Sequence, residues 1–139
     1  MIRRIISAAA ILTIALIFCL KAKAEDQPTL IKGFATAYNG PSDHTYTGKP
    51  VHEGICGGCE AYIGKTIILY QRLPGDQIGE CLGIFECEDT GPGTDGFREG
   101  RVIDVWCKDL EECQKFMEMI YTNNAKGKCW IQIVEDCNG

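Results

Sequence analysis

The stretch CEDTGPGTDGFREGRVIDVW, Cys87 to Trp106, decides which fold the chain can adopt. It leaves an apolar strand pattern, crosses a glycine-rich loop, and enters a second strand pattern over Arg101–Trp106. Short strands joined by glycine-rich turns are typical of small β-proteins. Three aspartates, Asp89, Asp95 and Asp104, lie within the stretch. Strands disfavour aspartate, so Asp104, between isoleucine and valine, needs a structural or chemical reason.

The segments around this stretch extend the β pattern. Further strands are predicted over Thr29–Asn39, Lys65–Tyr70, Cys81–Glu88 and Lys128–Glu135, and the turn RLPGDQIG separates the second of these from the third. Residues 40–60 are predicted to form a long loop that contains both histidines. Apolar residues at steps of three and four predict one helix over Leu110–Tyr121, with Asp109 as its N-cap. The sequence therefore predicts a mainly β protein, a small barrel rather than a doubly wound sheet.

The first residues have the pattern of a secretory signal peptide. Arg3 and Arg4 precede an apolar run of about 16 residues, and Ala22-Lys23-Ala24 offers a cleavage site. The run is shorter than the roughly 20 residues of a membrane span, and Phe18 before Cys19 disfavours lipidation. We expect a signal peptide over residues 1–24, one domain over 25–139, and a secreted protein, extracellular or periplasmic, with no stable membrane insertion.

Charge limits the partners of the mature chain. The whole chain has 14 Lys and Arg against 19 Asp and Glu, and the leader removes four basic residues and no acidic one. A net charge of about −9 is repelled by phosphate backbones, so a nucleic acid is not expected as partner. A neutral or cationic polymer, such as a polysaccharide, fits this charge.

Eight cysteines follow the leader, and an even number in a small exported domain predicts four disulfides. They are Cys56, Cys59, Cys81, Cys87, Cys107, Cys113, Cys129 and Cys137. Their connectivity stays open, because eight cysteines allow 105 pairings. Cys56-Gly-Gly-Cys59 is half of many zinc sites, but no second close pair follows, and no helix places it in a thioredoxin-like turn. We therefore expect no metal and no cofactor.

Four segments resemble, in order, the landmarks of the double-psi β-barrel cell-wall proteins. These are FATAYNG, IGKTIILY, ECEDTGPG and GRVIDVW, within residues 32–134. The family includes the three-aspartate (3D) domain proteins, the membrane-bound lytic transglycosylase A type, the rare-lipoprotein-A type and the expansins. The resemblance implies a six-stranded barrel with interlocked crossovers and a groove for a glycan strand, with peptidoglycan or a related polysaccharide as the partner.

The resemblance also implies roles for individual residues. In the lytic members, the aspartate of the IDV-like strand is the catalytic acid and the DTG aspartate lies beside it. Carried over, Asp104 is the candidate acid and Asp89 its neighbour. A lytic transglycosylase needs one acid, because the sugar's own 6-hydroxyl attacks to give a 1,6-anhydro product. The candidate substrate-binding residues are Tyr38, Tyr46, Thr90, Gly91 and Arg101.

Alternatives stand beside these roles. Asp-Thr-Gly is an ordinary turn signature, and Asp104 could instead pair with Arg98 or Arg101. Glu60 only loosely matches a further family aspartate, and the Asp89–Asp104 loop, which includes Asp95, is closer to the expansin style. We therefore consider three functions: a peptidoglycan lytic transglycosylase, a non-catalytic expansin-like binding module, and a barwin-like secreted defence or effector protein.

Overall fold

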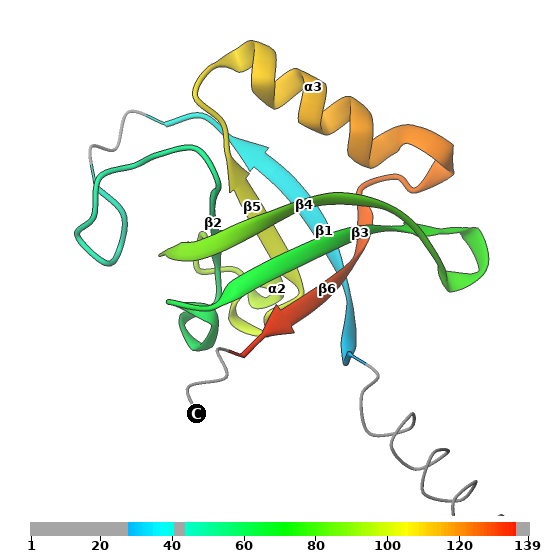
Figure 1. Ribbon diagram of the computed structural model, residues 1–139, viewed down its shortest axis with the longest axis horizontal. Helices are drawn as coiled ribbons and strands as arrows, with labels where there is room; N and C mark the ends of the chain where they lie inside the picture. Colours follow the sequence, from blue (N-terminus) through cyan, green and yellow to red (C-terminus); the bar gives the residue numbers. More distant parts are fainter. Residues whose placement is uncertain (1–27, 41–43, 136–139) are drawn as a thin grey trace, which may run out of the picture.

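The structure is a computed structural model that describes residues 28–40 and 44–135. The expected signal peptide, Cys19 and Cys137 lie outside the described residues. The described chain is mainly β, as the sequence predicts, with one long helix packed across one end of the strands (Figure 1). No helix within the described ranges is long and apolar enough to cross a membrane.

The described part of the chain contains six strands. They are β1 (Leu30–Tyr38), β2 (Ile55–Gly58), β3 (Thr66–Leu73), β4 (Gln77–Thr90), β5 (Val102–Trp106) and β6 (Lys128–Val134). The helices are α2 (Asp95–Arg98) and α3 (Leu110–Tyr121), with short 3-10 turns at η1 (Glu60–Tyr62), η2 (Pro74–Asp76) and η3 (Thr122–Asn124). The strand positions follow the sequence prediction, apart from β2 and the longer hairpin of β3 and β4.

The strands pair in the closed order β1-β5-β2-β4-β3-β6, with β6 returning to β1. Two of the pairings are parallel, β1 with β5 and β2 with β4, and the other four are antiparallel. Parallel neighbours cannot be joined by a tight turn, so the chain crosses over between them. The crossing of the strands is visible in Figure 1.

Alternating side chains from the strands fill the interior of this ring. Ile67 and Leu69 of β3, Ile103 of β5 and Ile131 of β6 are fully buried. Alternation along a strand sends the intervening residues to the outer face. Helix α3 covers one end of the ring through Ile120, which belongs to the same core cluster. The interior is therefore packed, and any site lies on the outer face or at an end.

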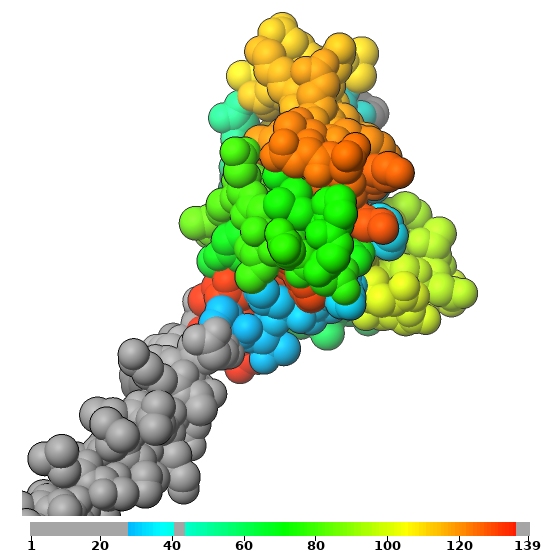
Figure 2. Space-filling model, turned by 90° about the vertical axis from the view of Figure 1, so that its right-hand side faces the viewer, coloured from blue at the N-terminus to red at the C-terminus, as the bar shows by residue number. Residues whose placement is uncertain are grey.

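The hairpin of β3 and β4 is longer than the sequence predicts. Most of RLPGDQIG is strand, and the turn shrinks to Pro74–Asp76, where Gly75 has a φ of 76°. Glycine adopts this left-handed conformation without steric cost. The paired strands below the C-terminal end of α3 are seen in Figure 2, in green beneath orange. Turn residues thus marked the position of the hairpin but not the extent of its pairing.

Two short elements lie where a loop is predicted. Strand β2 is the apolar and glycine run Ile55–Gly58, which is buried throughout and so has no alternation of polar and apolar residues. Helix α2 is a single turn within the aspartate loop and buries Phe97. The expected loop over residues 40–60 is therefore interrupted by a central strand of the barrel.

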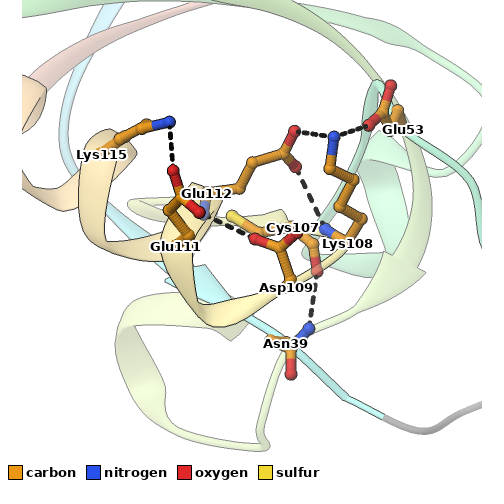
Figure 3. Close-up of polar contacts among 8 residues, drawn as sticks. All are labelled: Asn39, Glu53, Cys107, Lys108, Asp109, Glu111, Glu112 and Lys115. Atoms are coloured by element: carbon orange, nitrogen blue, oxygen red, sulfur yellow. Dashed lines mark hydrogen bonds and ion pairs between the residues drawn. The ribbon is translucent and has the colours of Figure 1, made fainter.

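The helix prediction is confirmed, including its cap. Helix α3 spans Leu110–Tyr121, and Asp109 Oδ1 accepts a hydrogen bond from the Glu112 amide at 2.8 Å. Lys108 lies between two carboxylates, 3.4 Å from Glu53 and 3.1 Å from Glu112 (Figure 3). These contacts connect the start of α3 to the loop that precedes β2.

Candidate functional site

Asp104 lies on the outer face of β5. Its neighbours Ile103 and Val105 point into the barrel, while Asp104 is half-buried on the opposite side. The hydroxyl of Thr36, its register partner on β1, donates a hydrogen bond to Asp104 Oδ1 at 2.7 Å. Neither Arg98 nor Arg101 forms an ion pair with this carboxyl within the described residues, so the alternative of an arginine-supported aspartate does not match the structure.

Asp89 lies at the end of β4 and receives three hydrogen bonds. The Tyr38 hydroxyl donates to Oδ2 at 3.1 Å, and the Tyr46 and Thr90 amides donate to Oδ1 at 3.1 and 3.0 Å. An ionised carboxylate accepts at both oxygens, so this donor set suits the charged form. The Thr90 amide belongs to the next residue in the chain, so part of this network is local, and Asp89 has both a structural role and the position expected of a site residue.

Gly57 of β2 separates the two aspartates. It is the register partner of Asp104 on one side and of Asp89 on the other. The carboxyl-bearing strands are thus two strand spacings apart, about 10 Å between backbones. Tyr38 interacts with both aspartates. Its hydroxyl donates a hydrogen bond to Asp89, and the charge of Asp104 contributes to raising the pKa of Tyr38.

Burial raises the pKa of Asp104 above its ordinary range, and the nearby charge of Asp89 raises it further. The Thr36 hydrogen bond acts in the opposite direction and is outweighed. Burial and the Asp89 carboxylate likewise raise the pKa of Tyr38, which keeps its hydroxyl protonated as a donor. The site thus combines a carboxyl that holds its proton to higher pH than usual with a second carboxyl that accepts three hydrogen bonds.

The raised pKa predicts a specific effect of pH on stability. The folded protein holds the Asp104 proton more tightly than the unfolded chain does. This contribution to stability is fully present below the ordinary pKa of 3.8 and is lost as the pH rises through the higher folded value. We expect the Asp104→Asn variant to gain stability over the parent as the pH rises from 3 to 7. Urea unfolding of both proteins across this range checks it, and a constant difference would contradict it.

A hollow of about 160 Å³ lies next to Asp89. Three of the expected substrate-binding residues line it: Tyr46, Thr90 and Gly91. Tyr46 is 59% exposed, and its hydroxyl donates to Glu60 Oε1 at 3.1 Å. Glu60 therefore joins the site through Tyr46, although its place in the sequence pattern is offset. The hollow is small for an enclosed ligand pocket, so it suits one stretch of an open groove.

Two residues of the segment between Asp89 and Asp104 lie apart from both aspartates. Arg101, an expected substrate-binding residue, forms an ion pair with the exposed Glu99. Asp95 begins α2 and pairs with Arg98 at 3.5 Å. Neither has a described contact with Asp89 or Asp104. Of the expected site residues, the structure brings together Tyr38 of β1, Tyr46 of the loop before β2, Asp89, Thr90 and Gly91 at the end of β4, and Asp104 of β5.

The seven described cysteines are all free thiols, and none has a partner at disulfide distance. Two pairs nevertheless lie in contact. Cys56 and Cys87 are register partners on β2 and β4 and hydrogen-bond through their side chains, which together with burial raises the pKa of Cys56. Cys107 likewise contacts Cys113 at the start of α3. The first pair lies in the core, one residue before Gly57 on β2 and two before Asp89 on β4.

Thr36 and Gly57 are site residues that sequence reasoning missed. Thr36 lies in the quoted FATAYNG segment, but only the register of β1 with β5 shows that it faces Asp104. A scan of known protein-family models finds no match for the chain, and no curated protein matches it. The candidate site therefore stands on the geometry of its own residues.

Proposed function

We propose that this chain is a secreted double-psi β-barrel protein that cleaves peptidoglycan glycan strands as a lytic transglycosylase. One observation carries the proposal: Asp104 is a half-buried carboxyl with a raised pKa, placed on an outer face beside the hydrogen-bonded Asp89. Glycan cleavage requires a group that is still protonated near the working pH. Asp104 has the surroundings that produce one.

In the proposed reaction, protonated Asp104 donates its proton to the glycosidic oxygen as the bond to the anomeric carbon breaks. The leaving sugar departs as an alcohol, and positive charge develops on the remaining ring. The carboxylate of Asp104 then accepts the proton of that ring's 6-hydroxyl, whose oxygen bonds to the anomeric carbon. Asp89, which accepts three hydrogen bonds, is placed to stabilise the developing positive charge.

The strand pairing supports the double-psi part of the proposal. A closed ring with two parallel pairings requires crossover connections, and interlocked crossovers are what distinguish this barrel from a simple meander. The connection that follows β4 contains α2 and leads into β5, so it delivers Asp89 and Asp104 from its two ends. This connection passes over the end of β2, which lies between β4 and β5 in the ring.

The cysteine contacts predict two of the four proposed disulfides. Cys56 with Cys87, and Cys107 with Cys113, are already neighbours and need only small movements to bond. We expect peptide mapping of the exported protein without reductant to recover both pairs. Loss of one native disulfide from a small secreted domain typically costs about 2–5 kcal/mol. Recovery of other pairings for these four residues, or of four unmodified thiols, would contradict this prediction.

The shallow hollow favours a second candidate, an expansin-like module that binds polysaccharide without cleaving it. Its exposed Tyr46 offers a ring face beside polar groups, and no step of binding needs the proton of Asp104. The third candidate, a barwin-like defence or effector protein, predicts neither binding to sacculi nor product.

Incubation of the mature protein with peptidoglycan sacculi separates these candidates. We expect the protein to sediment with sacculi and also to release soluble muropeptides. Sedimentation without release would leave the binding module, and neither result would leave the effector. Tyr46→Ala is expected to reduce sedimentation, whereas Tyr121→Ala, an equally exposed tyrosine on α3, is the matched control and leaves it unchanged.

A further inference from the structure

A histidine and two glutamates form a second cluster, separate from the aspartate pair. Ligand atoms of His52, Glu86 and Glu88 all lie within 4.8 Å of one another. Glu86 and Glu88 are two residues apart on β4, so the strand presents both on one face. His52 comes from the loop before β2, which lies over that face. His52 thus lies next to Glu86 and Glu88, although it is 34 and 36 positions from them in the sequence.

Glu88 is the unusual member of this cluster, because it is a carboxylate only 3% exposed. Its Oε1 atom is 3.1 Å from the Lys49 ammonium. Its Oε2 atom is sealed from solvent and has no hydrogen-bond partner among the described residues. A buried charged oxygen left without a partner is destabilising by several kcal/mol in general. Within the described residues, Oε2 therefore depends on the His52 ring that faces it or on a bound ion.

When His52 is neutral, the ring nitrogen that faces Glu88 Oε2 has no proton to donate, so the two atoms cannot form a hydrogen bond. Its Nδ1 atom lies 2.7 Å from the Glu53 carbonyl, which can only accept, so Nδ1 bears the proton. The lone pair of Nε2 then lies 3.3 Å from Glu88 Oε2. Two acceptors face each other, and a cation between them satisfies both. An Nδ1 proton held by a carbonyl is also the usual second contact of a metal-binding histidine.

We propose that His52 Nε2, Glu86 and Glu88 Oε2 bind a divalent first-row metal ion, with Zn²⁺ as the best fit. Two ligands in a tetrahedral zinc site with bonds of about 2.0–2.2 Å lie about 3.3–3.6 Å apart. The separation of Nε2 from Oε2, 3.3 Å, meets this value without movement of the buried glutamate. A mixed imidazole and carboxylate set suits zinc better than calcium or magnesium, which prefer oxygen alone.

The surroundings leave room and charge for such an ion. A hollow of about 350 Å³ opens beside the cluster and is lined by His52, Thr66, Phe85 and Glu86, among others. It gives the ion a route of entry and space for a water as fourth ligand. With His52 neutral, Glu86, Glu88 and Lys49 together have a net charge of −1, which attracts a divalent cation.

The ion would also fix the loop that contains Tyr46. The Thr47 amide donates to the Glu88 carbonyl at 3.4 Å, and the Tyr46 amide donates to Asp89 at 3.1 Å. Lys49 and His52 hold the same loop to the Glu88 side chain. A metal ion bound by His52, Glu86 and Glu88 would add a further connection between this loop and β4. The metal site stands without the proposed glycan cleavage, because none of its ligands belongs to the aspartate pair.

Isothermal titration of Zn²⁺ into the full mature protein tests the proposal. We expect binding that His52→Ala and Glu86→Gln each weaken by at least about tenfold, since even outer-shell changes cost 10–100-fold. Both residues are largely exposed, so the variants are expected to fold, which circular dichroism checks. His44→Ala in the same loop and Glu80→Gln on the same strand are the matched controls and retain parental affinity.

Two results would overturn the proposal. Zinc binding that persists in His52→Ala and Glu86→Gln would place the ion elsewhere in the protein. No zinc binding by the parent would leave Lys49 and His52 as the only described partners of the Glu88 carboxyl, without a metal ion.

Discussion

Asp104→Asn is expected to reduce the release of muropeptides from sacculi by about 10²–10⁴-fold, the usual contribution of a general acid. The amide can still accept the Thr36 hydrogen bond, so the local structure is retained. It has no proton acidic enough to give to a leaving oxygen. Sedimentation with sacculi is expected to be unchanged, because binding does not use the proton. Initial rates of release, measured beside sedimentation, check both expectations.

Asp95→Asn is the matched control for this prediction. Asp95 lies in the connection between β4 and β5, but it is exposed and pairs with Arg98. Its loss is expected to leave release within about twofold of the parent, since exposed ion pairs contribute little. If Asp104→Asn released muropeptides as fast as the parent does, the assignment of Asp104 as the acid would be wrong.

Gly33→Ala is expected to destabilise the barrel by about 1–3 kcal/mol or more, the range for overpacking a tight core. A Cβ atom at Gly33 would lie 2.4 Å from the Arg101 carbonyl oxygen and 2.5 Å from Ile131 Cδ1. The isoleucine can rotate, but the carbonyl is backbone and already accepts the Phe34 amide at 2.8 Å. Strand β1 would have to move away from β5 or β6. Urea unfolding measures the loss.

Gly40→Ala is the control for this substitution, placed just beyond the other end of β1. The nearest atom to its added Cβ is Tyr38 Cδ2 at 3.8 Å, an ordinary contact. We expect a change within about 0.5 kcal/mol, as for other unconstrained sites. Equal losses at positions 33 and 40 would show that chain stiffening, and not the contact with Arg101, determines the effect.

Local signals in the sequence predicted the regular parts of the fold. The α3 residues repeat at helical spacing after a capping Asp109, and that helix has the predicted bounds. The β2 run Ile55–Gly58 could not be recognised in the same way. It is paired with β4 along one edge and with β5 along the other and is buried throughout, so its pattern depends on neighbours that are distant in sequence. The same limit applies to α2, a single turn held by the burial of Phe97.

Some residues of the candidate site could be predicted from the sequence, and others could not. Asp104 was identified because aspartate inside an apolar strand needs an explanation, and Asp89 because of the family resemblance of its Asp-Thr-Gly motif. Thr36 and Gly57 gain their positions only from strand register, which no local pattern specifies. The proposed metal ligands lie beyond sequence reasoning for the same reason. His52 and Glu88 are far apart in the chain and meet because a loop folds over β4.

The chemical form of the released sugar end tests the central proposal most directly. Mass spectrometry of the soluble fragments from sacculi treated with the mature protein distinguishes the two ends, since an anhydro end lacks one water. Attack by the sugar's own 6-hydroxyl predicts 1,6-anhydro ends on the parent's products and their loss with Asp104→Asn. Free reducing ends would show that water is the nucleophile and would contradict the lytic mechanism, and the absence of soluble fragments would contradict cleavage itself.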